Sequence, residues 1–160
     1  MKNKKVIFVN QAAMIGAIYV VLGVVFAAFG TKAIQVRLAE ALTILPIFTG
    51  AAVPGLFIGC LVSNVLSGGI LPDVICGSLA TLMGALGTYK LGRMHPMLAP
   101  LPPIIANTLV ISFVLRYGYG EPFPIPYMML TVGIGEVLSC GVLGMILYMA
   151  LKPMRHRIFK

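Results

Sequence analysis

The chain has 160 residues, of which 59% are hydrophobic and only 10% are charged. Soluble domains carry about 25% charged residues, so a chain this poor in charge cannot cover the surface of a water-soluble domain. The net charge of +8 is concentrated near the two ends of the chain, beside apolar segments, which is typical of a membrane topology signal rather than a nucleic-acid surface. The composition therefore predicts an all-α integral membrane protein.

Six apolar segments follow one another, and we interpret them as six transmembrane helices of a single bundle that forms one domain, 1–160. A span needs roughly 20 apolar residues, so six spans fill the chain. The second and third segments are short and carry Pro46 and Pro54, so they can also be read as one broken span, which would give five helices. The expected helices are approximately 9–29, 36–48, 52–66, 72–91, 101–117 and 126–151.

The basic residues decide between six and five spans. With a cytoplasmic start, six spans place nine of the twelve Lys and Arg residues inside and three outside, namely Lys32, Arg37 and Arg116. Cytoplasmic loops of membrane proteins carry such an excess, whereas five spans would put one basic terminus outside. We therefore expect six helices with the N- and C-termini both cytoplasmic.

Several polar side chains interrupt the apolar segments. A charge at the membrane centre costs about 2.5–3.5 kcal/mol on insertion scales, so a charged side chain in such a segment indicates a structural or functional role. The topology places most of them in the outer half of the bundle, with Glu40 one turn below the outer surface and Glu136 near mid-depth. This distribution indicates a cavity open to the outside, suited to a polar, hydrogen-bonding ligand, a cation among the options. The candidate substrate-binding residues are Gln35, Arg37, Glu40, Asn64, Asp73, Asn107 and Glu136.

Purely structural roles are open alternatives for some of these residues. Arg37 and Glu40 are three apart and can pair with each other on one helix. Asp73 can serve as the acid at a helix N-terminus, and the two asparagines can bridge helices. Glu136 has no charged neighbour in the sequence, which makes it the strongest candidate for ligand binding.

Small residues form a strip on the first segment, where Ala12 and Gly16 lie beside Ala13 and Ala17. Such a strip permits the close approach of another helix, either inside the bundle or on a partner. The chain has no phosphate-binding loop and no HExxH motif, and its three cysteines lack metal-ligand spacing. We expect no enzyme activity, no catalytic residue, no metal and no cofactor in this chain. Uphill transport would then need ATP hydrolysis on other chains or an ion gradient.

Five stretches carry a resemblance to a known family: 34–46 (IQVRLAEALTILP), 53–64 (VPGLFIGCLVSN), 73–82 (DVICGSLATL), 98–103 (LAPLPP) with Asn107, and 135–140 (GEVLSC). In this order they resemble the QueT family, the substrate-binding S components of energy-coupling factor (ECF) transporters. The resemblance covers nearly the whole chain.

The resemblance implies a six-helix S component in the prokaryotic cytoplasmic membrane, a multi-pass plasma-membrane protein. It implies a queuosine precursor as ligand, either queuine or 7-aminomethyl-7-deazaguanine. The implied partners are a transmembrane coupling subunit and two ATPase subunits, which use the ATP, with docking through Ala13 and Ala17. The alternatives are an S component for another small vitamin or nucleobase-like solute, and a non-transporting membrane scaffold subunit.

The chemistry of the candidate residues agrees with such a ligand. A deazaguanine presents a ring N–H and an exocyclic amino group on one edge, and a carboxylate can accept both. We expect Glu136 or Glu40 to bind this edge. The amides of Gln35, Asn64 and Asn107 would then read the carbonyl and the ring nitrogen, and the remaining acid near the cavity mouth would hold the ligand amine. That acid is Asp73.

Overall fold

The computed structural model describes residues 3–27 and 36–158, apart from the side chains of His156 and Arg157. All regular structure within these ranges is helical. Four segments are long and apolar enough to cross a membrane: Lys4–Val25, Leu71–Met94, Pro96–Gly118 and Ile125–Met154. Two further apolar helices, Leu38–Ile47 and Ala52–Leu66, are shorter. An all-α membrane bundle is therefore confirmed, but only four of its six main segments have spanning length.

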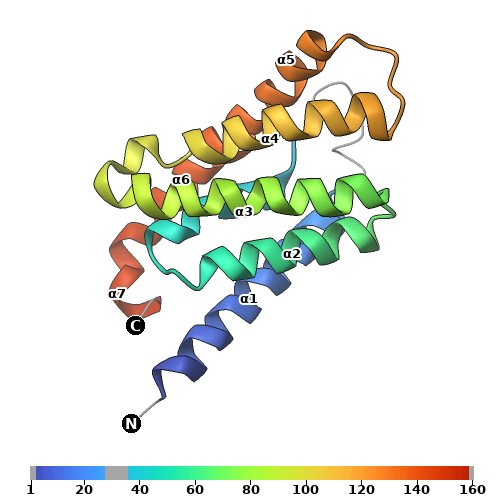
Figure 1. The fold of residues 1–160 in the computed structure, drawn as a ribbon. Coiled ribbons are helices and arrows are strands. Elements are labelled where there is room, and N and C mark those ends of the chain that lie inside the picture. The colour runs from blue at the N-terminus through green and yellow to red at the C-terminus, as the bar shows by residue number, and fades with distance from the viewer. Residues whose placement is uncertain (1–2, 28–35, 159–160) are drawn as a thin grey trace.

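Figure 1 shows the path of the chain. Helix α1 packs mainly against α2, while α3 packs against α2 and α4, and the segment η2 lies against α1, α3, η5 and α6. The elements in chain order are α1 (Lys4–Val25), η2 (Leu38–Ile47), α2 (Ala52–Leu66), α3 (Leu71–Met94), η3 (Pro96–Leu98), α4 (Leu101–Phe113), η4 (Val114–Gly118), α5 (Ile125–Glu136), η5 (Val137–Leu143), α6 (Gly144–Leu151), η6 (Lys152–Met154) and α7 (Arg155–Ile158).

The bundle has two chemically different ends. The start of α1, the connection between α3 and α4, and α7 lie at the same end in Figure 1, which we call the basic end. The opposite end, where α2 turns into α3 and α4 connects to α5, we call the cavity end. Among the residues whose side chains are described, the exposed Lys and Arg residues of the basic end are Lys4, Lys5, Lys90, Arg93, Lys152 and Arg155.

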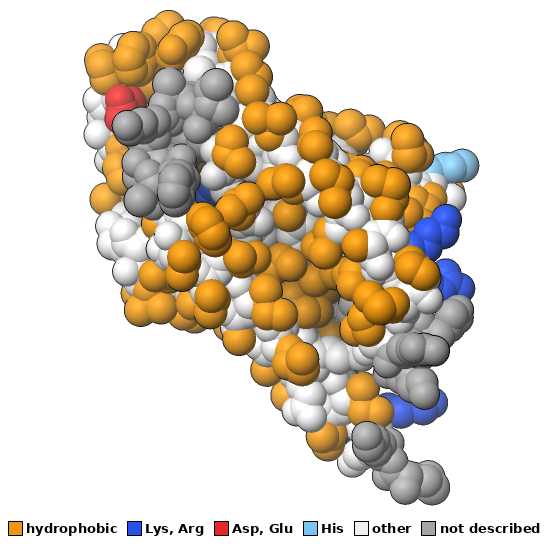
Figure 2. Space-filling view, turned by 180° about the vertical axis from the view of Figure 1, so that it is seen from behind, with side chains coloured by type: hydrophobic (Ala, Val, Ile, Leu, Met, Phe, Trp, Pro, Cys, Tyr) orange, Lys and Arg blue, Asp and Glu red, His pale blue; other side chains and the backbone are white. Residues whose placement is uncertain are grey.

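The outside of the bundle is apolar and its inside is partly polar. Figure 2 shows hydrophobic side chains over most of one face, with Lys and Arg gathered mainly along one edge. Buried positions in turn include Glu40, Asn64, Asn107 and Glu136, together with several Ser and Thr residues. This reversal of the pattern of soluble proteins is expected when lipid solvates the exterior.

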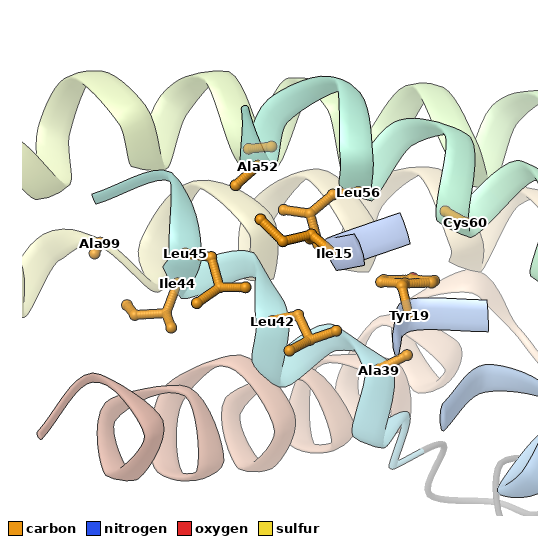
Figure 3. Packing of buried hydrophobic residues seen from close by; sticks show 11 residues of the cluster. Ile15, Tyr19, Ala39, Leu42, Ile44, Leu45, Ala52, Leu56, Cys60 and Ala99 are labelled. Carbon is orange, nitrogen blue, oxygen red and sulfur yellow. The ribbon is translucent and has the colours of Figure 1, made fainter. Parts of the chain in front are cut away.

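The segment η2 is a ten-residue 3₁₀-helix inside the bundle. Its residues 39–40 and 42–46 are buried, and Figure 3 shows Ala39, Leu42, Ile44 and Leu45 pointing toward neighbouring elements. At a rise of about 2.0 Å per residue it is roughly 20 Å long, well short of the ~30 Å hydrocarbon core. The expected second transmembrane helix is therefore a short, protein-enclosed segment. Its enclosure makes the irregular backbone tolerable at membrane depth.

Helices α1 and α2 approach closely through small residues. A Cβ atom on Gly55 of α2 would lie 2.6 Å from the carbonyl oxygen of Ala12, and one on Gly16 would lie 3.0 Å from the carbonyl oxygen of Gly55. Tyr19, one turn further along α1, is fully buried between η2 and α2, as Figure 3 shows. The close contact thus fixes α1 where its tyrosine reaches the interior of the bundle.

Candidate functional site

A cavity of about 390 Å³ lies at the cavity end of the bundle. Its wall comes from the ends of α1, α2 and α4, the beginnings of η2, α3 and η4, and the adjoining connections. Leu22, Phe26, Ile111 and Val114 contribute apolar surface, and a few polar side chains interrupt it. A concave, mainly apolar site with a few convergent polar groups is the usual form of a small-molecule site.

Four polar residues form a chain of hydrogen bonds around this cavity. The Arg37 guanidinium donates to Asn64 Oδ1 at 2.8 Å, and Asn64 Nδ2 donates to the backbone carbonyl oxygen of Asp73 at 3.3 Å. The Tyr119 hydroxyl donates to Asp73 Oδ2 at 2.9 Å. The last bond joins the 119–124 connection to the first turn of α3. Four separate elements are thereby held around one opening.

Tyr119 lies beyond the last membrane-spanning residue of its helix and remains a donor at neutral pH. Burial raises its pKa above the ordinary value, and the neighbouring negative charge of Asp73 raises it further. A tyrosine whose pKa is raised stays protonated across physiological pH. Tyr119 therefore remains the donor of its hydrogen bond to Asp73 in this range.

A second group of polar side chains lies deeper in the bundle, where Glu40 and Glu136 are 0% and 2% exposed. One ligand atom each of Glu40, Glu136 and Cys140 lies within 4.8 Å of the other two. The Cys140 thiol donates to Glu136 Oε2 at 3.2 Å. The Tyr19 hydroxyl donates to Glu40 Oε1, whereas Glu40 Oε2 is buried without a partner. Two carboxylates thus converge from distant parts of the sequence.

Local helix geometry accounts for the position of Glu136. It ends α5, and the π-helical segment η5 follows immediately. Ser139 and Cys140, three and four residues later, are buried on the same side, as neighbours at this spacing share a helix face. Ser139 Oγ accepts a hydrogen bond from the backbone N–H of Arg37 at 3.1 Å, which connects η5 to the start of η2. Short π-helical turns are frequent at functional sites.

Asn107 of α4 completes the deep group. Its side chain is 1% exposed and lies beside the Glu136 carboxyl. Neither its amide nitrogen nor its amide oxygen has a hydrogen-bond partner. Buried amides in proteins are nearly always hydrogen-bonded, so an unpartnered amide and carboxylate oxygen together indicate a place for a bound donor and acceptor.

The structure divides the predicted site residues into two levels. Arg37, Asn64 and Asp73 line the cavity, whereas the other three described candidates form the deep group beneath it. Tyr19 joins the levels because it lines the cavity and donates to Glu40. Gln35 lies outside the described residues. The predicted binding roles themselves stay predictions.

The alternative structural roles are also informed by these contacts. Arg37 donates a hydrogen bond to Asn64, and Glu40 accepts one from Tyr19, so the two residues do not form a hydrogen-bonded pair with each other. Asp73 lies in the first turn of α3, where its charge is favourable, and it also accepts from Tyr119. Asn64 bridges helices as expected for a structural amide, but it does so at the cavity wall.

Three contributors were missed by sequence reasoning: Tyr19, Tyr119 and Cys140. Cys140 follows Glu136 by four residues, and this helical spacing could have identified it. The tyrosines could not be selected in this way, since neither is close in sequence to the acid that accepts its hydrogen bond.

The small-residue strip on α1 separates into two faces. Ala12 and Gly16 pack against α2, whereas Ala13 and Ala17 are exposed. The exposed pair lines a groove of about 480 Å³ between α1 and α2. The other lining residues are Phe8, Val9, Ala12, Gly16, Val20, Pro54, Ile58, Gly59 and Val62. This apolar groove is separate from the cavity.

The model of a protein family, described as QueT transporter, matches residues 9–153 of the chain. Comparison with curated proteins and with solved structures gives no match. The matched range includes every predicted site residue and every groove residue except Phe8.

Proposed function

The chain belongs to the QueT transporter family, and from this premise we propose that it is the substrate-capture S component of an ECF-type importer for queuosine precursors. The family is one of transporters rather than enzymes, and the apolar helices indicate a multi-pass membrane protein. The observation that carries the proposal is the converging pair Glu40 and Glu136 beside an unpartnered amide, with Tyr19 joining the pair to the cavity wall. A planar base with several N–H donors and one carbonyl matches this arrangement.

The two levels divide the recognition of the ligand. The deep carboxylates accept the ring N–H and exocyclic amino group of the deazaguanine edge, and Asn107 supplies the donor for its carbonyl. Asp73, at the cavity wall, holds the amine of an aminomethyl substituent. The apolar cavity wall covers the faces of the ring.

Binding of queuine, 7-aminomethyl-7-deazaguanine and guanine to the purified chain tests this function. We expect saturable binding of at least one deazapurine and a loss of at least about 30-fold in affinity in Glu136→Ala, because removing one partner of a buried charged contact costs about 2–5 kcal/mol. Glu40→Ala should weaken binding comparably. The control is Met97→Ala, at an exposed residue of the basic end that does not line the cavity.

Unchanged affinity in both variants of the deep pair would contradict the assignment of the site. Absence of a saturable thermal shift with any deazapurine would favour the membrane scaffold. Saturable binding of a different vitamin or nucleobase-like solute would favour another S component.

We place the basic end in the cytoplasm and the cavity end outside, since the exposed Lys and Arg residues of the basic end fit the positive-inside rule. Labelling of Met97→Cys and Glu121→Cys from each side of sealed vesicles tests this orientation. The cavity then opens to the side from which a nutrient arrives. Transport also requires energy, which in this proposal comes from ATP hydrolysis by two ATPase subunits bound to a coupling subunit.

The groove along Ala13 and Ala17 is the proposed docking surface for the coupling subunit. Its support is an apolar lining with small exposed residues, which let a partner helix approach closely. Ala13→Trp should abolish co-purification with the coupling and ATPase subunits while ligand affinity stays unchanged, because the groove and the cavity are separate. Met14→Trp is the matched control, as Met14 is exposed on the same helix but does not line the groove. Loss of the complex in both variants, or in neither, would contradict this surface.

A further inference from the structure

The deep carboxylate pair carries more negative charge than its surroundings balance. The described titratable or charged groups nearest to the pair come from every element packed around it: Tyr19 of α1, Arg37 at the start of η2, Cys60 of α2, Asp73 of α3 and Cys140 of η5. The neighbour from α4 is the neutral Asn107. Among these described groups, Arg37 is the cation that faces both acids, so two ionised carboxylates would leave at least one negative charge in excess.

Geometry adds to this imbalance. The two carboxylates approach to within 4.8 Å and are closed off from solvent, where repulsion between like charges is much stronger than in water. Tyr19 and Cys140 each donate one hydrogen bond, to Glu40 Oε1 and to Glu136 Oε2. Glu40 Oε2 is buried and receives no hydrogen bond. A buried carboxyl oxygen in this position needs either a donor or a proton of its own.

We propose that Glu40 and Glu136 share one proton in the empty site, and that a positively charged ligand displaces this proton when it binds. A shared proton belongs to the pair rather than to one residue, as in other closely spaced carboxylates. It cancels the excess charge and supplies the missing donor. The second half of the proposal rests on the proposed function, because it requires that the pair contact the ligand.

The exchange is balanced in charge and atoms. The protonated pair and the ligand cation react to give the ionised pair with the cation bound, and one proton leaves through the cavity to the solvent. The ligand N–H groups take over the hydrogen bonding that the proton provided. The cation is held at Asp73 on the cavity wall, and Arg37 faces both Asp73 and the pair, so the charge of the cation offsets the negative charge that the pair gains. A neutral ligand brings no such charge, so it binds with the proton in place. The affinity for the cation therefore rises by about tenfold per pH unit while the pair is protonated, and the affinity for a neutral ligand does not.

Infrared spectroscopy of the ligand-free chain tests the first half without any ligand. The C=O stretch of a protonated carboxylic acid should be present at neutral pH and should disappear in both Glu40→Gln and Glu136→Gln. Glu121→Gln, at an exposed acid, should leave it unchanged. Absence of the band in the wild type, or its persistence in both deep variants, would overturn the proposal. A band that appears only after treatment with a chelator would overturn it too, since a metal ion would then occupy the pair.

Calorimetry in two buffers of different ionisation enthalpy tests the displacement. Binding of 7-aminomethyl-7-deazaguanine should release about one proton, whereas binding of guanine, which is neutral, should release about none. Equal proton release for both ligands, or none for the cation, would refute displacement. If the infrared band is present but no deazapurine binds, the proposed function fails while the shared proton stands. If a deazapurine binds but the infrared band is absent, the shared proton fails while the proposed function stands.

Discussion

The polar interior at Glu40 and the groove between α1 and α2 use the same helix in opposite ways. In the interior, Tyr19 of α1 supplies one hydroxyl to one carboxylate oxygen, in a place closed to water. In the groove, Ala13 and Ala17 supply nothing but small size and apolar surface. The interior therefore depends on single polar atoms that make hydrogen bonds. The groove, and the close contact between α1 and α2 beside it, depend on side chains that are small or missing.

The largest effect is expected where a polar atom is removed from the interior. Tyr19→Phe deletes the hydroxyl that donates to Glu40 and leaves that buried carboxylate without its hydrogen bond. Loss of the partner of a buried group costs about 1–3 kcal/mol, and more when the group is charged. We expect lower thermal stability and weaker ligand binding. Tyr127→Phe, at an exposed tyrosine, is the control. Equal stability of the two variants would break the contrast between interior and groove.

An intermediate effect is expected where one methyl group is added beneath the groove. Gly55→Ala places a Cβ 2.6 Å from the Ala12 carbonyl oxygen, so α1 and α2 must separate. Overpacking costs about 1–3 kcal/mol, and here helix displacement relieves part of it. Thermal unfolding measures the loss. The control is Gly133→Ala, whose Cβ would lie at an ordinary 3.5 Å from Thr108. A stable Gly55→Ala protein would show that the close approach is not required.

The smallest effect is expected at the cavity wall. Tyr119→Phe removes the bond to Asp73 but leaves both residues partly accessible to water. A hydrogen bond of this kind contributes about 1 kcal/mol, so ligand dissociation should be up to about fivefold faster, with little change in thermal stability. Rapid-mixing dissociation measurements with pH-matched wild type provide the test. A loss of thermal stability as large as that of Tyr19→Phe would mean that hydrogen bonds at the cavity wall matter as much as those in the interior.

Much of this organisation could be predicted from the sequence because membrane insertion penalises polar side chains. Glu40, Asn107 and Glu136 stand out against apolar surroundings, and the structure indeed buries all three. Their grouping could not be predicted in full. Counting residues predicts Glu40 one turn below the outer surface and Glu136 near mid-depth, and no sequence pattern connects the two. The structure brings their carboxylates together, because the 3₁₀-helix that carries Glu40 lies inside the bundle against η5.

The contacts made by side chains of ordinary polarity were harder still to predict. Tyr119 reaches Asp73 across 46 positions of sequence, and no local pattern marks such a pair. The two faces of the small-residue strip were equally ambiguous, because alanine and glycine suit both an internal contact and an external groove. Only the placement of α2 against Ala12 and Gly16 distinguishes them.

The buried 3₁₀-helix has a consequence for how the protein is made. Leu38–Ile47 is too short to enter the bilayer as an independent span, and it carries an acid that lipid would reject. Several of the elements that enclose it, including α3, η5 and α6, are synthesised after it. A nascent chain that has emerged only as far as α2 therefore holds a segment with no stable place in the membrane. Biosynthesis must keep this segment sheltered until α3, η5 and α6 have been made, so elements translated after the segment complete its enclosure.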